Sequence, residues 1–380
     1  MQHYCPNKFE YLQIDVEKRL LYNCHNALPE KIKTSWIENN PGKIFNTDSM
    51  VQERKQMLRG ERNKACDFAC YPTEDKGGTS ERMKVLEHNK AIYTDPISKI
   101  KTLAINCSTN CNLSCTYCSG FFSSTWRNTV KEHGTFADLG KNWHDVFDKV
   151  SEKQKMKTPF VDTLVREVER MNSLEQVFFV GGEPILSNYL DLFLDALDIE
   201  KTKIYITTGL GVGENRFKRL LEKFKSIKNL ELQISAEDLG EYYEYNRYNN
   251  TYEKFTNYIN LIREHDIKFT FITTVCNLTL FGLHDFYKKF NSETKIGYNY
   301  LDKPDFLQKF VLDNESKKVL QDTWSKHNDS YSDKILNGLE YEPTEHQRKM
   351  CRLYMTQLKD RRNQSYDIFP ESFLKWLELK

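Results

Sequence analysis

Three cysteines lie close together in the run Cys111-Asn-Leu-Ser-Cys115-Thr-Tyr-Cys118. This C-x₃-C-x₂-C spacing places three soft thiolate ligands within eight residues, with no fourth ligand beside them. A closed structural zinc site takes four protein ligands. Three thiolates instead suit a cubane iron–sulfur cluster in which one iron is left open to a ligand that is not protein. The run therefore predicts chemistry at an open iron.

The position of this run supports the interpretation. It follows directly after a predicted strand over residues 100–106. In parallel α/β folds, ligand sites gather at the carboxyl ends of the strands. A second run, Gly181-Gly182-Glu183-Pro184, ends the next predicted strand over residues 176–180, one crossover later. Glycines at such a point permit close approach to the backbone.

Together these two runs resemble the radical S-adenosyl-L-methionine (radical SAM) superfamily. The family signature is C-x₃-C-x-aromatic-C, with Tyr117 as the aromatic residue, and its G-G-E-P element binds the methionine amine of SAM. The resemblance implies a [4Fe–4S] cluster on Cys111, Cys115 and Cys118, with SAM on the fourth iron. It further implies one-electron cleavage of SAM to methionine and a 5′-deoxyadenosyl radical, which abstracts hydrogen from a substrate.

Other strand ends extend the resemblance. Ser235-Ala-Glu237, followed by Arg247, is similar to the S-x-D element and arginine that contact the ribose and carboxylate of SAM, with Glu237 where aspartate is usual. Thr208 stands at the asparagine of a T-N-G element, although a simple β–α turn explains it equally well. Asn277 is a further candidate for this pocket. The implied cofactor-binding residues are Tyr117, Gly181, Gly182, Glu183, Thr208, Ser235, Glu237 and Arg247.

A second set of cysteines lies upstream, at Cys5, Cys24, Cys66 and Cys70. With a predicted hairpin before Cys24, their layout resembles the SPASM or twitch modules that hold an auxiliary cluster, although here the module precedes the barrel. Four thiolates fit a fully ligated [4Fe–4S] cluster and equally a Cys₄ zinc site, so both remain open. The other three cysteines, Cys107, Cys276 and Cys351, are predicted to be packed in the core.

The composition excludes several classes. A net charge of +1 over 380 residues gives no sign of a general nucleic-acid or membrane surface. No apolar run approaches the ~20 residues that span a bilayer, and the first residues do not read as a signal peptide. Ten cysteines in such a chain favour metal or redox use over disulfides. We therefore expect a cytoplasmic protein.

Strands and helices alternate from about residue 100. Strands are predicted at 100–106, 176–180, 203–208, 230–235, 267–275 and 295–300. Helical patterns lie at 160–171, 188–197, 216–224, 252–262 and 283–290, and in the tail at 345–359 and 371–379. This alternation predicts an α/β fold with a parallel sheet. With the resemblance, we expect a partial (β/α)₆ barrel of the radical SAM type at 98–310. A small cysteine-rich auxiliary-cluster domain at 1–90 precedes it, and a helical C-terminal extension at 311–380 follows it.

The first part of the long insertion at 121–172 is a candidate lid over the site.

The resulting functional hypothesis is a radical SAM enzyme that acts on a small-molecule, sugar or nucleotide substrate, with an auxiliary iron–sulfur cluster. One alternative is a ribosomal-peptide maturase of the SPASM or twitch type. A second is a non-catalytic zinc or iron–sulfur scaffold. The resemblance implies an electron donor such as flavodoxin or ferredoxin as a partner. The sequence selects neither a catalytic acid or base nor an oxidoreductase or isomerase outcome.

Overall fold

The computed structural model describes residues 3–140 and 158–380. These residues form two compact units. The first, here called the N-terminal unit, comprises residues 3–108, 158–206 and 223–231, and the second, the C-terminal unit, comprises 109–140, 207–222 and 232–380. The three-part domain division at 1–90, 98–310 and 311–380 stays a prediction.

Nine strands form a mixed sheet in the order β3-β2-β1-β4-β5-β6-β7-β8-β9. Within the described residues the end strands β3 and β9 do not pair, so the barrel is partial, as predicted. The six strands expected from the sequence are all present. The strands are β1 (Tyr11–Asp15), β2 (Leu20–Tyr22), β3 (Glu30–Lys31), β4 (Thr102–Asn106), β5 (Gln176–Val180), β6 (Lys203–Thr208), β7 (Leu230–Ser235), β8 (Lys268–Val275) and β9 (Ile296–Tyr300).

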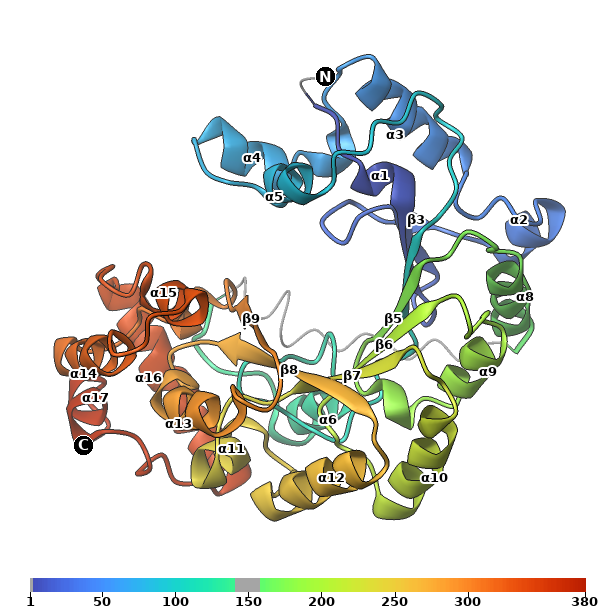
Figure 1. The fold of residues 1–380 in the computed structure, drawn as a ribbon. Helices are drawn as coiled ribbons and strands as arrows, with labels where there is room; N and C mark the ends of the chain where they lie inside the picture. The colour runs from blue at the N-terminus through green and yellow to red at the C-terminus, as the bar shows by residue number, and fades with distance from the viewer. Residues whose placement is uncertain (1–2, 141–157) are drawn as a thin grey trace. The chain divides into compact units, whose positions relative to one another are not determined.

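In the N-terminal unit, β1 pairs in parallel with β4 over five residues, from Tyr11 opposite Thr102 to Asp15 opposite Asn106. β4 pairs in parallel with β5, where Asn106 lies opposite Val180. The carboxyl ends of these three strands therefore share one edge, as the strand ends of a parallel sheet must. Helices α8 (Thr158–Glu169) and α9 (Tyr189–Asp195) lie on the same side of β5 and β6 (Figure 1).

The cysteine-rich residues 3–88 are organised around a buried arginine. Arg54 donates from Nε to the carbonyl oxygen of Lys8 and from Nη2 to that of Phe45, both at 2.7 Å. Its Nη1 donates to Asn46 Oδ1 at 2.8 Å and to the carbonyl oxygen of Pro96 at 3.1 Å. One side chain thus binds three separate segments of the chain. The helical segments here are α1 (Asn7–Glu10), α2 (Thr34–Asn39), α3 (Asp48–Leu58), η1 (Lys64–Cys66), α4 (Cys70–Asp75) and α5 (Glu81–His88).

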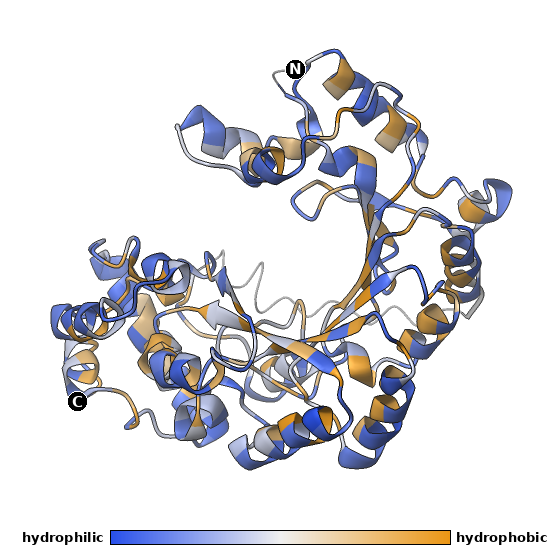
Figure 2. Cartoon of the chain, viewed as in Figure 1, coloured by the Kyte–Doolittle hydropathy of each residue, from blue (hydrophilic) through white to orange (hydrophobic). Residues whose placement is uncertain are grey.

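The helices of the C-terminal unit bury one face each. In α12 (Tyr252–Glu264) the buried residues are Phe255, Tyr258, Ile259 and Ile262, which is the i, i+3, i+4, i+7 pattern of an amphipathic helix. Figure 2 accordingly shows both hydrophobic and hydrophilic residues along these helices. The remaining helical segments are α6 (Ser124–His133), η2 (Pro184–Leu186, in the N-terminal unit), α10 (Glu214–Lys225), α11 (Gly240–Asn246), α13 (Leu280–Phe290), η3 (Asp305–Leu307), α14 (Asn314–Trp324), α15 (Ser330–Leu336), α16 (Glu345–Arg362) and α17 (Glu371–Trp376).

The predicted helical tail is confirmed by α16 and α17. A capping box between Thr344 and Gln347 begins α16, and Asn363, in the left-handed region with φ of 48°, ends it. No helix among the described residues has the length and apolar character needed to cross a membrane.

The candidate lid is only partly visible. Its residues 141–157 lie outside the described residues. Residues 124–133 form α6, where Trp126 is buried in the same core cluster as Tyr354.

Candidate cluster and cofactor site

The loop of Cys111, Cys115 and Cys118 is anchored to the end of α11. The backbone N–H of Thr116 donates to the carbonyl oxygen of Asn246 at 3.0 Å, and that of Ser114 donates to the carbonyl oxygen of Tyr248 at 3.2 Å. The hydroxyl of Thr116 also donates to Asn246 Oδ1 at 2.7 Å. These contacts fix the residues between the cysteines, so the positions of the thiols follow from a held backbone.

Burial works against the ionisation of two of these thiols, Cys115 and Cys118. Cys115 is buried, while Cys111 and Cys118 are partly exposed. Burial raises the pKa of the Cys118 thiol to about 12. It also raises the pKa of Cys115, an effect that Arg247 opposes. A group that supplies positive charge, such as cluster iron, would stabilise all three as thiolates. The donor set of three soft thiolates therefore fits a cluster with one open iron.

Among residues 3–140 and 158–380, no three His, Cys, Asp or Glu side chains are arranged to hold a single metal ion. A cubane cluster differs from a single ion because each cysteine binds a different iron.

A buried ion pair lies beside the cysteine loop. Arg247 donates to both carboxylate oxygens of Glu237, at 2.9 Å from Nε and 2.8 Å from Nη2. The hydroxyl of Tyr117 donates to Glu237 Oε1 at 2.6 Å. Arg247 Nη1 lies 3.9 Å from Cys115 Sγ. Three of the residues named from the sequence, Tyr117, Glu237 and Arg247, are thus brought together next to Cys115.

The charge of this arginine is secured by its neighbours. Burial disfavours the charged form, but Glu237, Tyr117 and Cys115 outweigh it and hold the pKa of Arg247 well above its ordinary value. Glu237 has no exposed surface and also accepts from the backbone N–H of Thr274 at 3.2 Å. The longer side chain in place of the usual aspartate thus serves as the counter-ion of Arg247.

The remaining candidates of the C-terminal unit are less engaged with this pair. Ser235 ends β7 and is partly exposed, two residues before Glu237. Thr208 accepts from the backbone N–H of Leu210 at 2.9 Å, which is the geometry of a β–α turn. Asn277 donates to the carbonyl oxygens of Phe306 and Val311 and thereby ties core segments together.

Gly181, Gly182 and Glu183 lie in the N-terminal unit, at the end of β5. Gly181 has φ of +126°, and a Cβ atom there would meet Asn106 Oδ1 at 2.4 Å and the Ser108 carbonyl oxygen at 2.7 Å. Gly182 donates to that same carbonyl oxygen at 2.9 Å. Only glycine fits at position 181, because the end of β4 approaches so closely. Glu183 is buried.

The four upstream cysteines are all buried. Cys5 and Cys66 share an apolar cluster with Met57 and Tyr71. Burial raises the pKa of Cys5 to about 12, with further contributions from Cys24, Cys66 and Cys70. Burial likewise raises the pKa of Cys66 to about 11. These mutual effects place the four thiols within electrostatic reach of one another.

A buried lysine, which the sequence did not single out, lies beside this set. Lys8 Nζ donates to Asn23 Oδ1 at 2.5 Å and to Glu53 Oε2 at 2.6 Å. Its positive charge acts to lower the pKa values of Cys24 and Cys66, against the larger effect of burial.

The predicted packed cysteines behave as expected. Cys107, Cys276 and Cys351 have no exposed surface.

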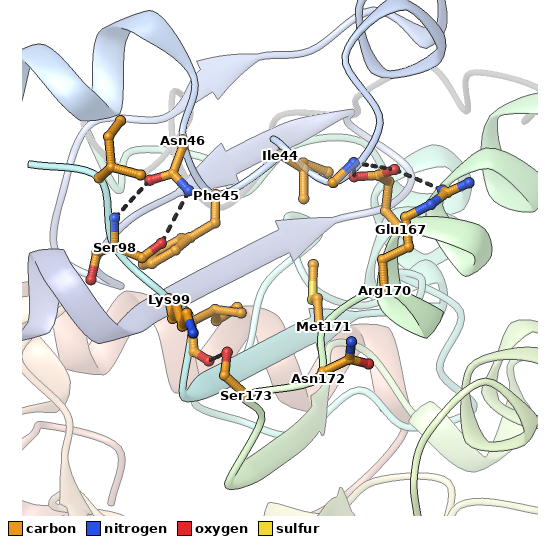
Figure 3. Close-up of a pocket in the computed structure, with 13 residues that line it drawn as sticks. Ile44, Phe45, Asn46, Ser98, Lys99, Glu167, Arg170, Met171, Asn172 and Ser173 are labelled. Carbon is orange, nitrogen blue, oxygen red and sulfur yellow. Dashed lines mark hydrogen bonds and ion pairs between the residues drawn. The ribbon is translucent and has the colours of Figure 1, made fainter.

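A separate cavity of about 400 Å³ lies between the loop of residues 42–46 and the end of α8 (Figure 3). Its polar groups bind one another: Glu167 accepts from Gly42 N and from Arg170 Nη1, each at 2.9 Å. Asn46 Nδ2 donates to the carbonyl oxygen of Ser98 at 3.0 Å. No residue named as a site candidate lines this cavity.

Comparison with known proteins identifies a family match over the region that contains the cysteine loop. Residues 105–289 match the sequence model of the Radical SAM superfamily. No curated protein matches the chain.

Solved structures with related folds include "Native anSMEcpe with bound AdoMet", at 18% identity and a TM-score of 0.40 over 60% of each chain. Streptococcus suis SuiB bound to precursor peptide SuiA aligns at 14% identity and a TM-score of 0.40, over 84% of this chain and 70% of that one. Streptococcus suis SuiB bound to S-adenosylmethionine aligns at 12% identity and 0.41, over 89% and 76%. The chain thus spans about 60% of the length of anSMEcpe. Likeness at this level does not bear on the activity of this chain.

The matched region contains both the cysteine loop and the Gly181–Pro184 run, together with Glu237 and Arg247. Residues 105–289 of this chain are therefore similar in sequence to the Radical SAM superfamily.

Proposed function

We propose that this chain cleaves SAM reductively and abstracts a hydrogen atom from a small-molecule, sugar or nucleotide substrate, with a second iron–sulfur cluster on Cys5, Cys24, Cys66 and Cys70. The observation that carries the proposal is the buried Arg247–Glu237 pair, which lies against Cys115 and Tyr117. Burying an ion pair costs desolvation free energy, and functional sites are where such charged groups are most often found. This pair lies beside Cys115, one of the proposed cluster ligands.

Each residue of the site has a defined task. Cys111, Cys115 and Cys118 would hold three irons of the cluster, and the bound cluster would supply the electron for cleavage of SAM to methionine and a 5′-deoxyadenosyl radical. Arg247 presents a fixed positive charge next to Cys115, which suits the carboxylate of SAM. Glu237 keeps that guanidinium oriented through two hydrogen bonds. The burial of this pair excludes water, which protects a radical from side reactions.

The auxiliary site is supported by four buried thiols, of which Cys24, Cys66 and Cys70 add to the effect of burial in raising the pKa of Cys5. Such a group is stable as thiolates only with a compensating metal centre. Tetrahedral S₄ coordination suits zinc as well as iron, so zinc is the competing occupant. With iron–sulfur there, the site is suited to accept an electron from the product radical.

The substrate class is argued from the N-terminal residues. β1 pairs with β4 and extends the sheet, and residues 3–88 carry all four upstream cysteines. These residues are therefore engaged in the sheet and the auxiliary site, which leaves them little scope as a separate leader-peptide domain. This favours a small-molecule, sugar or nucleotide substrate over a ribosomal peptide. We further propose a flavodoxin or ferredoxin as the electron donor.

The test begins with anaerobic reconstitution of the full chain and measurement of iron, sulfide and zinc. Dithionite and SAM are then added, and 5′-deoxyadenosine is quantified with and without a dialysable small-molecule fraction or a peptide fraction. Cys115→Ala and Cys351→Ala are the matched pair of variants, because Cys351 is a core cysteine outside the site.

About eight irons, with 5′-deoxyadenosine from the parent and from Cys351→Ala but not from Cys115→Ala, support the proposal. A content of about four irons and one zinc would mean that the upstream cysteines hold structural zinc and not an auxiliary cluster. Stimulation by the peptide fraction alone reassigns the enzyme to peptide maturation. An iron-loaded parent that forms no 5′-deoxyadenosine overturns the catalytic proposal and favours a non-catalytic scaffold.

A further inference from the structure

The carbonyl oxygens of the cysteine loop accept hydrogen bonds from side chains, in addition to the hydrogen bonds that its backbone N–H groups donate. The carbonyl oxygen of Leu113 accepts from Ser123 Oγ at 2.7 Å, and that of Cys115 accepts from Trp126 Nε1 at 2.9 Å. The carbonyl oxygen of Ser114 accepts from Arg362 Nη2, and that of Thr116 accepts from the hydroxyl of Tyr354. Four successive carbonyl groups, Leu113 to Thr116, thus each bind a side chain.

Two of these four donors come from one helix near the end of the chain. Tyr354 and Arg362 are eight residues apart on α16, on the face that also buries Cys351, Met355 and Leu358. This spacing places both side chains on one side of a helix, about two turns apart. α16 therefore contacts the loop at two points, on either side of Cys115.

Arg362 is committed to this contact. It is only 7% exposed, and its Nη1 donates to the carbonyl oxygen of Tyr245 at 3.4 Å. Its guanidinium lies over the ring of Tyr248 at 4.7 Å and over that of Trp126 at 5.3 Å. Trp126 is itself a donor to the loop, so the stacked arginine and tryptophan hold neighbouring carbonyl groups.

We propose that Arg362, assisted by Tyr354, is a positioning residue for the radical SAM cluster: it fixes the backbone between Cys111 and Cys118 so that the three thiols present the geometry of three cluster irons. The proposal rests on the cluster assigned to these cysteines. The physical reason is that the loop has no helix or strand of its own, so its carbonyl groups depend on side chains for their hydrogen bonds. A buried arginine supplies planar donors that a lysine cannot reproduce.

The test compares Arg362→Met, Arg362→Lys and Tyr354→Phe with Arg361→Met as the matched control. Arg361 is the neighbouring residue on α16, and it also stacks on an aromatic ring and binds two carbonyl oxygens, those of Gly134 and Thr135. It does not contact the cysteine loop in these bonds. Thermal unfolding, the electron paramagnetic resonance signal of the reduced cluster with and without SAM, and the rate of iron loss to a chelator are measured on the full chain.

We expect Arg362→Met to lose the SAM-responsive signal while it unfolds at the temperature of Arg361→Met. Arg362→Lys should recover part of the signal, since it keeps the charge. Tyr354→Phe should keep the signal but lose iron about fivefold faster, as expected for one lost hydrogen bond.

Equal SAM-responsive signals in Arg362→Met and Arg361→Met overturn the inference. If Arg362→Met does not fold, Tyr354→Phe decides, and a rate of iron loss equal to that of Arg361→Met is then the contrary result. A parent chain without any SAM-responsive signal contradicts the proposed function instead, so the two failures are distinguishable.

Discussion

The cysteines at 111–118 and those at 5–70 reach their positions by different means. The first three are neighbours in sequence, and the surrounding side chains bind the backbone between them. The other four come from separate segments, and the buried cations near them organise those segments. Arg54 binds three stretches of chain, while Lys8 lies beside Cys24 and Cys66.

This difference teaches how each site tolerates change. Where the backbone is held, two of the thiols can be partly exposed and an iron left open without loss of the loop. Where the thiols come from distant segments, the site depends on buried charges that must remain paired. The two sites should therefore respond differently to loss of a ligand and to loss of a neighbouring charge.

The largest expected effect separates the two sites outright. Cys111→Ala/Cys118→Ala should abolish 5′-deoxyadenosine formation, because SAM loses the open iron. Cys66→Ala/Cys70→Ala should lose a similar amount of iron, about four atoms, but still cleave SAM. Iron analysis and 5′-deoxyadenosine assays on both proteins check this. The comparison fails if the second variant is also unable to cleave SAM while its first cluster is intact by electron paramagnetic resonance.

The next largest effect concerns the counter-ion at the first site. Glu237→Gln should destabilise the fold by about 3–5 kcal/mol, because Arg247 would remain charged and buried without its partner. The measurement is denaturant unfolding of the metal-free chain. Glu241→Gln, an exposed residue on α11, is the control. A loss as small as that of the control would mean that the charge of Arg247 is met by other groups.

A smaller loss is expected at the second site. Lys8→Met leaves the carboxylate of Glu53 without its cation, but Glu53 is 18% exposed and can be hydrated. We therefore expect the free energy of unfolding to fall by about 1–3 kcal/mol. The auxiliary cluster should also shift to a more negative reduction potential, because a nearby positive charge is gone.

Redox titration followed by electron paramagnetic resonance measures that shift, with the exposed Lys84→Met as control. Lys8→Met/Glu53→Gln should regain stability, since no unpaired carboxylate remains. An unchanged potential in Lys8→Met would show that this charge does not act on the cluster.

The smallest effect is a pH dependence behind the first site. Burial, followed by the charge of Glu237, raises the pKa of Asp238 well above its ordinary value, and Asp238 accepts from Asn246, which anchors Thr116. The stability this group contributes is present below its unfolded pKa of about 3.9 and is lost as pH rises above it. Asp238→Asn lacks this loss, so its stability relative to the parent should rise between about pH 4 and pH 8. A constant difference in unfolding temperature over that range would contradict the assignment.

Local patterns predicted much of the fold. β-branched and aromatic runs located β5, β6 and β7 with the bounds that the structure has. The start of α3 at Asp48 is also set locally, because the side chain of Thr47 accepts from the backbone N–H of Met50. β3 was not expected, since a two-residue strand has no pattern of its own.

The site was predictable only where its chemistry is local. The cysteine spacing predicts the cluster ligands, and the end of a strand pointed to Glu237, which the structure pairs with Arg247. Lys8 looks in sequence like any surface lysine, and only its burial with Asn23 and Glu53 sets it apart. The role of Arg362 was equally hidden, because its partner Ser114 is 248 residues away. Contacts between residues so far apart in the chain produce no local sequence pattern from which they could be predicted.

That separation has a consequence for how the protein is made. A ribosome releases Ser114 long before it has synthesised Arg362 and Tyr354. During that interval the loop of Cys111, Cys115 and Cys118 is complete in sequence but lacks two of its four carbonyl donors. We therefore expect cluster insertion at this loop to follow the synthesis of α16. A chain interrupted before α16 would contain all three cysteines, but the backbone between them would lack the hydrogen bonds from Tyr354 and Arg362.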